Sequence, residues 1–79
     1  MNTKVYKSVF SRMSEYSVLI QYDSNDNIYI ASIPELNGCM AHGKTREDAT
    51  KEINIALEMW IEELIECGME IPKPILFAS

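Results

Sequence analysis

The chain has 79 residues and a mass of 9.0 kDa, which corresponds to one small domain. This size excludes a two-domain enzyme, a TIM barrel and a complete dinucleotide-binding fold. Apolar residues make up 47% of the chain. This fraction is enough to build a hydrophobic core, but the stability left over is small. We therefore expect a homo-oligomer, a dimer or a tetramer, because a second copy can cover apolar surface that one small layer leaves exposed.

The negative charge is concentrated in one segment. Residues 46–67 carry two cations and seven acids, which accounts for the whole formal charge of −5, and the rest of the chain is balanced. Phosphate backbones are bound by clustered cations, so we expect no direct binding of nucleic acid. The acidic segment suits a basic partner instead.

The sequence also indicates a cellular compartment. It contains no apolar run long enough to span a membrane, and its N-terminus lacks the pattern of a signal peptide. These features predict a cytoplasmic protein without membrane contact. In that compartment Cys39 and Cys67 are expected to be reduced thiols.

The chain divides into an N-terminal arm and one domain. Residues 1–14 have no firm period and fit a helix, an extended arm or a disordered tail equally well. Residues 15–79 form the domain. Its first strand is predicted at residues 16–22, which are β-branched and aromatic, and its second at residues 28–33. The five turn-forming residues 23–27 between them predict an antiparallel hairpin.

A third short strand and a long helix follow. Pro34 ends the second strand, a tight connection follows with Asn37 and Gly38 able to hold positive φ, and residues 39–42 are predicted as the third strand. Thr45 and Asp48 form a capping-box pattern that begins a helix of about 22 residues. Its apolar positions form one stripe: Ala49, Ile53, Ala56, Leu57, Trp60, Leu64 and Cys67.

The helix is predicted to end at a glycine, and the chain then returns to the sheet. Gly68 suits a left-handed C-cap, and Pro72 and Pro74 prohibit further helix. Residues 71–77 are expected to add a short edge strand. The fold class is therefore α+β, a two-layer sandwich of β-β-β-α-β order. In it a three-stranded antiparallel sheet with the short edge strand packs on one long helix. Alternation does not tell which sheet face packs on the helix.

Three motifs in this order resemble the HicB-like antitoxin family. They are the Pro-Glu-Leu-Asn-Gly-Cys turn at residues 34–39, the Gly-Lys-Thr-Arg-Glu-Asp-Ala helix start at residues 43–49, and Gly-Met-Glu-Ile-Pro-Lys-Pro at residues 68–74. The resemblance covers residues 16–74, about three quarters of the chain. It implies a partial ribonuclease H-like fold and a prokaryotic toxin–antitoxin system.

The resemblance implies a partner as well as a fold. Family members neutralise a small basic HicA-like toxin that cleaves mRNA, by covering its active surface. Longer members add a C-terminal DNA-binding module, which is not expected here because the sequence ends at Ser79. The interpretation is thus a non-enzymatic antitoxin that occludes a HicA-like toxin. The alternatives left open are a solitary self-associating domain without a toxin and, more weakly, a residual nuclease.

The sequence offers three candidate sites of chemistry. Cys39, His42 and Cys67 give only three metal ligands, and a structural zinc site requires four. His42 has no neighbouring nucleophile or orienting carboxylate at a defined spacing, so an exposed histidine at a strand end is preferred over a general base. The turn acids Asp23 and Asp26, with Glu35, do not have the strand-centre placement of a two-metal nuclease. We therefore expect no metal, no cofactor and no catalytic residue.

The helix supplies the candidate binding surface. Glu58, Glu62 and Glu66 recur every four residues opposite the apolar stripe, where like charges repel unless they are compensated. Ile55 and Met59 are apolar residues near this face. The five residues are either a solvated face with scattered apolar side chains or a docking face for the cations of a partner.

Overall fold

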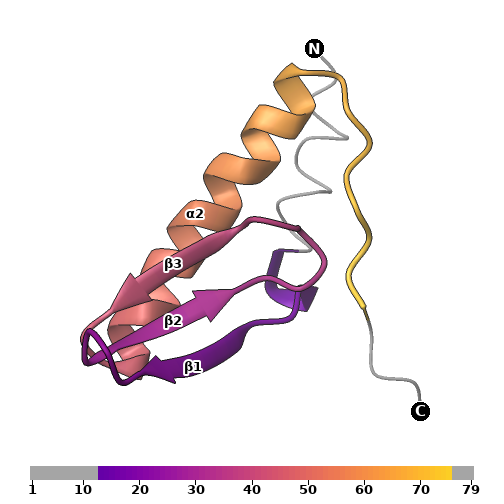
Figure 1. Cartoon of the computed structure of the whole chain (residues 1–79). Coiled ribbons are helices and arrows are strands. Elements are labelled where there is room, and N and C mark those ends of the chain that lie inside the picture. Colours follow the sequence, from indigo (N-terminus) through magenta and orange to yellow (C-terminus); the bar gives the residue numbers. More distant parts are fainter. Residues whose placement is uncertain (1–12, 76–79) are drawn as a thin grey trace.

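The computed structural model describes residues 13–75 as a three-stranded sheet covered by one long helix (Figure 1). The elements are η1 (Met13–Glu15), β1 (Leu19–Asp23), β2 (Ile28–Ser32), β3 (Met40–Gly43) and α2 (Arg46–Glu66). The strands lie in the order β1-β2-β3, antiparallel throughout. The predicted α+β class is thus confirmed. Most of the expected N-terminal arm, residues 1–12, lies outside the described residues.

The predicted hairpin is present, with a later start and a tighter loop. β1 begins at Leu19 instead of residue 16, and only residues 24–27 separate it from β2. Asn27 takes a positive φ of 55° there, and the Tyr22 hydroxyl donates to its Oδ1 at 3.0 Å. Tyr22 also stacks edge-on against Tyr29 across the pair, with ring centroids 5.1 Å apart. Aromatic pairs of this kind help to hold an antiparallel pair in register.

The register decides which sheet face packs on α2. Ile20 lies opposite Ala31, which lies opposite Ala41, and Ala31 is fully buried. Directly opposed residues project to the same side of a sheet, so this row faces the helix. The neighbouring row of Gln21, Ile30 and His42 therefore lies on the open face.

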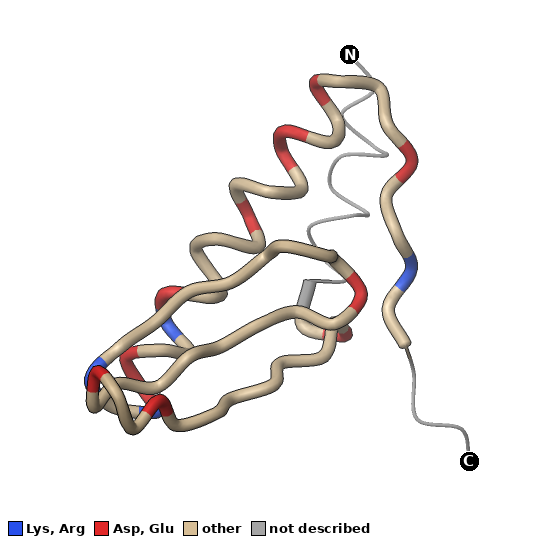
Figure 2. Tube along the Cα trace, in the orientation of Figure 1, with Lys and Arg blue, Asp and Glu red and all other residues tan. Residues whose placement is uncertain are grey.

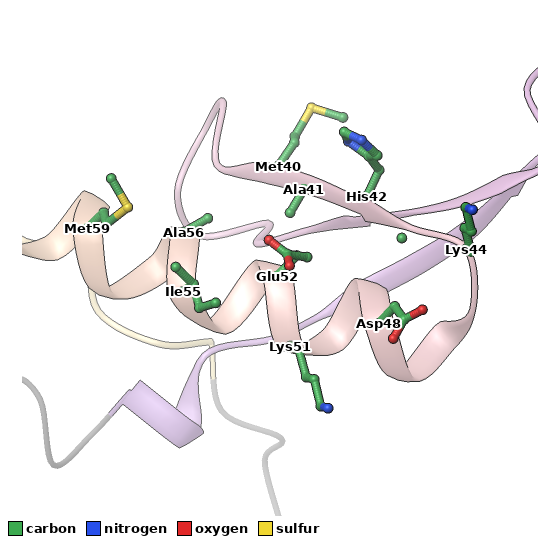
Figure 3. Close-up of a pocket in the computed structure, with 11 residues that line it drawn as sticks. Met40, Ala41, His42, Lys44, Asp48, Lys51, Glu52, Ile55, Ala56 and Met59 are labelled. Carbon is green, nitrogen blue, oxygen red and sulfur yellow. The ribbon is translucent and has the colours of Figure 1, made fainter.

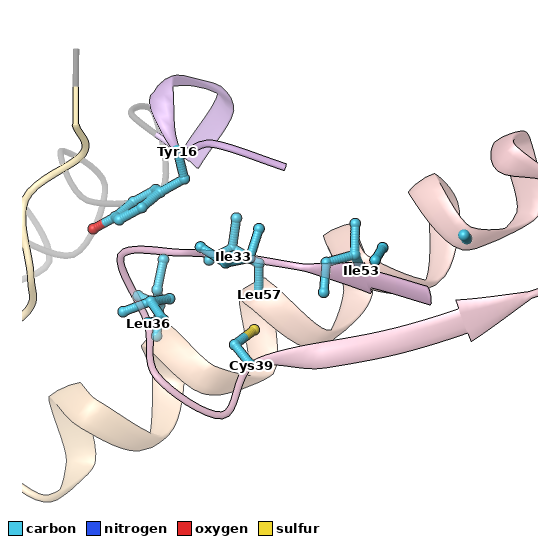
Figure 4. Close-up of a cluster of buried hydrophobic side chains, with 9 residues drawn as sticks. Tyr16, Ile33, Leu36, Cys39, Ile53 and Leu57 are labelled. Carbon is cyan, nitrogen blue, oxygen red and sulfur yellow. The ribbon is translucent and has the colours of Figure 1, made fainter. Parts of the chain in front are cut away.

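The core lies where α2 crosses the sheet and the connection between β2 and β3 (Figure 4). Ile33, Leu36 and Cys39 come from that connection and are almost fully buried. Gly38 holds a φ of 95°, and a Cβ there would lie 3.3 Å from the Trp60 ring. Glycine suits the positive φ, and a Cβ would press against the Trp60 ring.

The ends of α2 match the sequence prediction. The Thr45 hydroxyl accepts from the Asp48 backbone N–H at 3.0 Å. At the other end Gly68 has a φ of 66° and donates to the carbonyl of Ile65, while Met69 donates to Leu64. This is the Schellman arrangement that uses the last free carbonyls of a helix.

The predicted apolar stripe of α2 needs one correction. The fully buried ridge is formed by four residues spaced by four: Ala49, Ile53, Leu57 and Ile61. Ile61 was not predicted on the stripe. Cys67, which was predicted there, is exposed because it follows the last helical residue as the C-cap. Trp60 and Leu64 are half-buried at the margin of the ridge.

The expected edge strand after the helix is wrong for the residues that the structure describes. Residues 71–75 form no strand, and residues 76 and 77 lie outside the described part. Side chains hold this segment instead, since the Tyr16 hydroxyl donates to the Pro72 carbonyl and Glu35 accepts from the Ile75 N–H. Pro72 and Pro74 have no backbone N–H, so this segment has too few donors for the hydrogen bonds between paired strands.

Candidate functional site

The acidic row of α2 lies on the solvent side of the helix, as predicted. Glu58 and Glu66 are exposed and Glu62 is half-buried at one-turn spacing. Acidic residues follow one another along the C-terminal half of α2 (Figure 2), where the last turn has no basic residue. Adding negative charge near the negative end of a helix dipole costs stability, so this row is not explained by the folding of α2.

The two apolar residues of the predicted surface belong to a neighbouring groove. Ile55 and Met59 are 54% and 64% exposed and line a hollow of about 600 Å³ between α2 and β3 (Figure 3). Met40 and Ala41 line the same hollow from the strand. The three glutamates are not among its lining residues. The predicted surface therefore divides into an acidic row and an apolar groove.

Sequence reasoning missed the charged end of the groove. Lys44, Asp48, Lys51 and Glu52 line it where α2 begins. They provide two cations and two carboxylates, so this part is balanced in sign, unlike the acidic row. No spacing along the chain could have found them together, because the groove exists only through the packing of β3 on α2.

The candidate metal ligands are not brought together. Cys39 is buried in the core, His42 is exposed on the open face of the sheet and Cys67 is exposed beyond the helix. Burial raises the pKa of the Cys39 thiol, which disfavours the thiolate that metal binding requires. Within residues 13–75 no three histidine, cysteine or acidic side chains converge on a common point.

The three carboxylates of the candidate nuclease site also have separate roles. Asp23 caps the hairpin loop by accepting from the Asn25 N–H at 2.9 Å, and Asp26 lies exposed in that loop. Glu35 follows β2 and accepts from the Ser17 N–H and hydroxyl at 3.0 Å and from the Ile75 N–H at 2.8 Å. These are the contacts of structural residues.

The pKa of Glu35 reflects these contacts. Partial burial by itself raises the pKa of this carboxyl, but hydrogen bonds from the backbone N–H groups of Ile75, Ser17 and Glu35 and from the Ser17 hydroxyl together outweigh burial and hold the pKa below its ordinary value. Hydrogen bonds to the charged form favour ionisation. Glu35 therefore acts as a charged tie between distant segments.

The fold and its surfaces define a small α+β domain with a uniformly acidic helix side and an open apolar groove. Within the described residues, no helix combines the length and the apolar character needed to cross a membrane.

Comparison with known proteins assigns this domain to a family. Residues 16–78 match the model of the HicB-like antitoxins of bacterial toxin–antitoxin systems, and the chain belongs to this family. A UPF0150 protein of Thermoplasma acidophilum is 36% identical over 75% of this chain and 84% of its own length. Two UPF0150 proteins of Synechocystis are 40% and 32% identical over 73% of this chain and 72% and 78% of theirs. No solved structure matches the chain significantly, so the likeness to ribonuclease H stays a prediction.

Proposed function

We propose that the protein is an antitoxin that binds a small basic HicA-like toxin and blocks its mRNA-cleaving surface by direct occlusion. Membership of the HicB-like antitoxin family is the observation that carries this proposal. The proposed mechanism is binding without turnover, in the cytoplasm where the target mRNA is found. It requires no cofactor and no direct contact with nucleic acid.

The acidic row of α2 is the proposed contact with the toxin. Glu58, Glu62 and Glu66 present three like charges on one helix side, and their mutual repulsion is relieved when cations dock beside them. Charged rows of this kind mainly speed up association and select the partner by sign. Ile55 and Met59, next to the row, are the proposed apolar part of the predicted surface.

The test is co-expression with the small basic protein encoded beside this chain. Wild-type protein should be captured by the toxin and should restore growth. The triple variant Glu58→Lys, Glu62→Lys and Glu66→Lys should lose capture and rescue, because it reverses the sign of the contact. A matched variant, Asp26→Lys, Glu47→Lys and Glu70→Lys, changes the net charge equally at exposed positions away from the C-terminal half of α2 and should still rescue.

Two results would count against the proposal. The first is the absence of a basic neighbour that the wild-type chain can bind. The second is full rescue by the variant of the acidic row, which would place the contact elsewhere. RNA cleavage by the pure chain in Mg²⁺, lost in His42→Ala, would instead support a nuclease.

A further inference from the structure

A second pocket lies at the C-terminal end of α2 and shares no lining residue with the groove beside β3. This helix-end pocket has a volume of about 250 Å³ and is lined by Trp60, Glu63, Leu64, Cys67 and Met69. None of these residues belongs to the proposed toxin contact, so the pocket requires a partner of its own.

The sheet does not cover the apolar side chains of this pocket. The last buried residue of α2 is Ile61, and the turns after it project beyond the strands (Figure 1). Trp60 and Leu64 are half-buried there, and Met69 is 61% exposed. A partner that covers these side chains removes apolar surface from water, which favours binding.

The charge around the helix-end pocket is acidic. Residues 60–70 contain four glutamates and no cation. Glu63 lies in the lining itself, and Glu70 is exposed directly after Met69. The last turn of α2 has no basic residue to offset the negative end of the helix dipole. The pocket therefore suits a partner that combines apolar side chains with positive charge.

The first twelve residues of the chain have this composition. They contain no acid, and their cations and larger apolar residues are Lys4, Lys7, Arg12, Val5, Tyr6, Val9 and Phe10. The other segment outside the described residues, 76–79, has no charged side chain. Charge complementarity therefore favours the N-terminal segment as the partner of the pocket.

The contacts of Tyr16 place this segment within reach of the pocket. Tyr16 directly follows η1, and its hydroxyl donates to the Pro72 carbonyl, so the start of the described chain lies beside the segment that leaves α2. Three residues separate Pro72 from Met69 of the pocket, at most ~10 Å of chain. The eight residues from Val5 to Met13 can extend over ~27 Å, which is enough to bring Val5 to the pocket.

We propose that residues 1–12 dock on the helix-end pocket of the same chain, with apolar side chains over Trp60 and Leu64 and cations beside Glu63 and Glu70. The covalent connection gives the segment an effective concentration on the order of 1 mM, so a weak contact is enough to populate the docked state. The docked segment shields Trp60 and Cys67 from solvent. This proposal does not depend on a toxin, and the two proposals fail separately.

The first test uses two reporters that the pocket already contains. Trp60 is the only tryptophan of the chain, and Cys67 is an exposed thiol whereas Cys39 is buried. A segment that is docked for half of the time or more slows modification of Cys67 by a thiol reagent roughly twofold or more. The double variant Val5→Glu and Val9→Glu should lose this protection, because its carboxylates are repelled by Glu63, and acrylamide should then quench Trp60 more strongly.

The matched control makes the same kind of change elsewhere. Val18 and Leu19 are 40% and 47% exposed at the start of β1, and the double variant Val18→Glu and Leu19→Glu should keep the wild-type reactivity of Cys67. Circular dichroism should show a native helix in both double variants. Equal reactivity of Cys67 in wild type and in the N-terminal variant would overturn the proposal.

The second test traps the docked segment. Val5→Cys or Val9→Cys should form a disulfide with Cys67 of the same chain on mild oxidation at low micromolar concentration, because a disulfide requires Cα atoms within about 7 Å. Asn25→Cys, exposed in the hairpin loop, should not. Failure of both N-terminal cysteines to cross-link would contradict docking. A disulfide between two chains would assign the pocket to a second copy, and protection of Cys67 only after addition of the toxin would assign it to the toxin; either result contradicts docking within one chain.

Discussion

Glu35 joins three parts of the chain that are far apart in sequence. Its carboxylate lies after β2, Ser17 precedes β1 and Ile75 follows the helix, and all three meet at one end of the sheet. This tie explains the late start of β1, since the Ser17 N–H is used by a side chain and not by the ladder. Glu35, which belongs to the Pro-Glu-Leu-Asn-Gly-Cys turn that resembles the family motif, thus has a structural role.

Replacing Glu35 should weaken the fold in a pH-dependent way. Glu35→Gln removes the charge that the two N–H groups solvate and should lower the free energy of unfolding by about 1 kcal/mol at neutral pH, after allowance for solvent exposure. The folded pKa lies below the ordinary value of 4.5, so the charged form stabilises fully above that pH. Its contribution is lost as the pH falls through the lower folded pKa.

The measurement is urea unfolding at pH 7 and at pH 3 for both proteins. The gap between wild type and Glu35→Gln should narrow at the lower pH. A gap that is equal at both values would show that the charge of Glu35 does not contribute.

Gly43 shows how a missing side chain sets the distance between two elements. A Cβ on Gly43 would lie 2.4 Å from the Ala49 nitrogen and 2.7 Å from the Asp48 carbonyl carbon, both of which are backbone atoms. Gly43→Ala should therefore push β3 away from α2 and cost roughly 1–3 kcal/mol in thermal or urea unfolding. Gly68→Ala meets no atom within 4 Å and bears only the strain of a φ of 66°, about 1 kcal/mol. An equal or smaller loss at Gly43 would contradict this contact.

At the scale of the elements, the start of α2 depends on one side chain. The Thr45 hydroxyl accepts a hydrogen bond from the backbone N–H of Asp48 in the first turn of the helix. Thr45→Ala removes the acceptor of the Asp48 N–H and should cost about 1 kcal/mol. Thr45→Ser keeps the hydroxyl and should restore most of the loss. Both effects are measured by chemical unfolding followed by circular dichroism. Two equally destabilised variants would assign the loss to the Thr45 methyl group.

The elements that sequence could predict are those with local causes. The Thr45 cap, the Gly68 end and the turn before Ile28 each depend on neighbours a few residues away, and each is present. The edge strand over residues 71–77 failed because its backbone groups are claimed by Tyr16 and Glu35, which are far away in sequence. Alternation alone could not choose the packed face of the sheet either.

The candidate binding surface shows the same difference between features with local causes and features that depend on tertiary packing. The acidic row follows from the helical period, so the sequence could place its residues on one side of α2. The groove could not be predicted, because Met40 and Met59 line one hollow only when β3 docks beside the helix. Tertiary packing, not periodicity, separates the two surfaces.

At the scale of the whole molecule, the two surfaces differ in their physical chemistry. The acidic row presents charge of one sign, whereas the groove between α2 and β3 presents apolar side chains and a charged end that is balanced in sign. Charge attraction between exposed groups is screened within about 10 Å at 0.1 M salt. Apolar association is not weakened by salt in this way.

Salt should therefore weaken the part of the proposed toxin contact that depends on the acidic row. Raising NaCl from about 0.05 to 0.5 M should slow association with the basic toxin by roughly tenfold or more, measured by stopped-flow fluorescence of Trp60. The Glu58→Lys, Glu62→Lys and Glu66→Lys variant should lose this dependence because the steering charge is gone. A wild-type association rate that does not change with salt would mean that the acidic row does not guide the toxin, whatever the affinity of the complex.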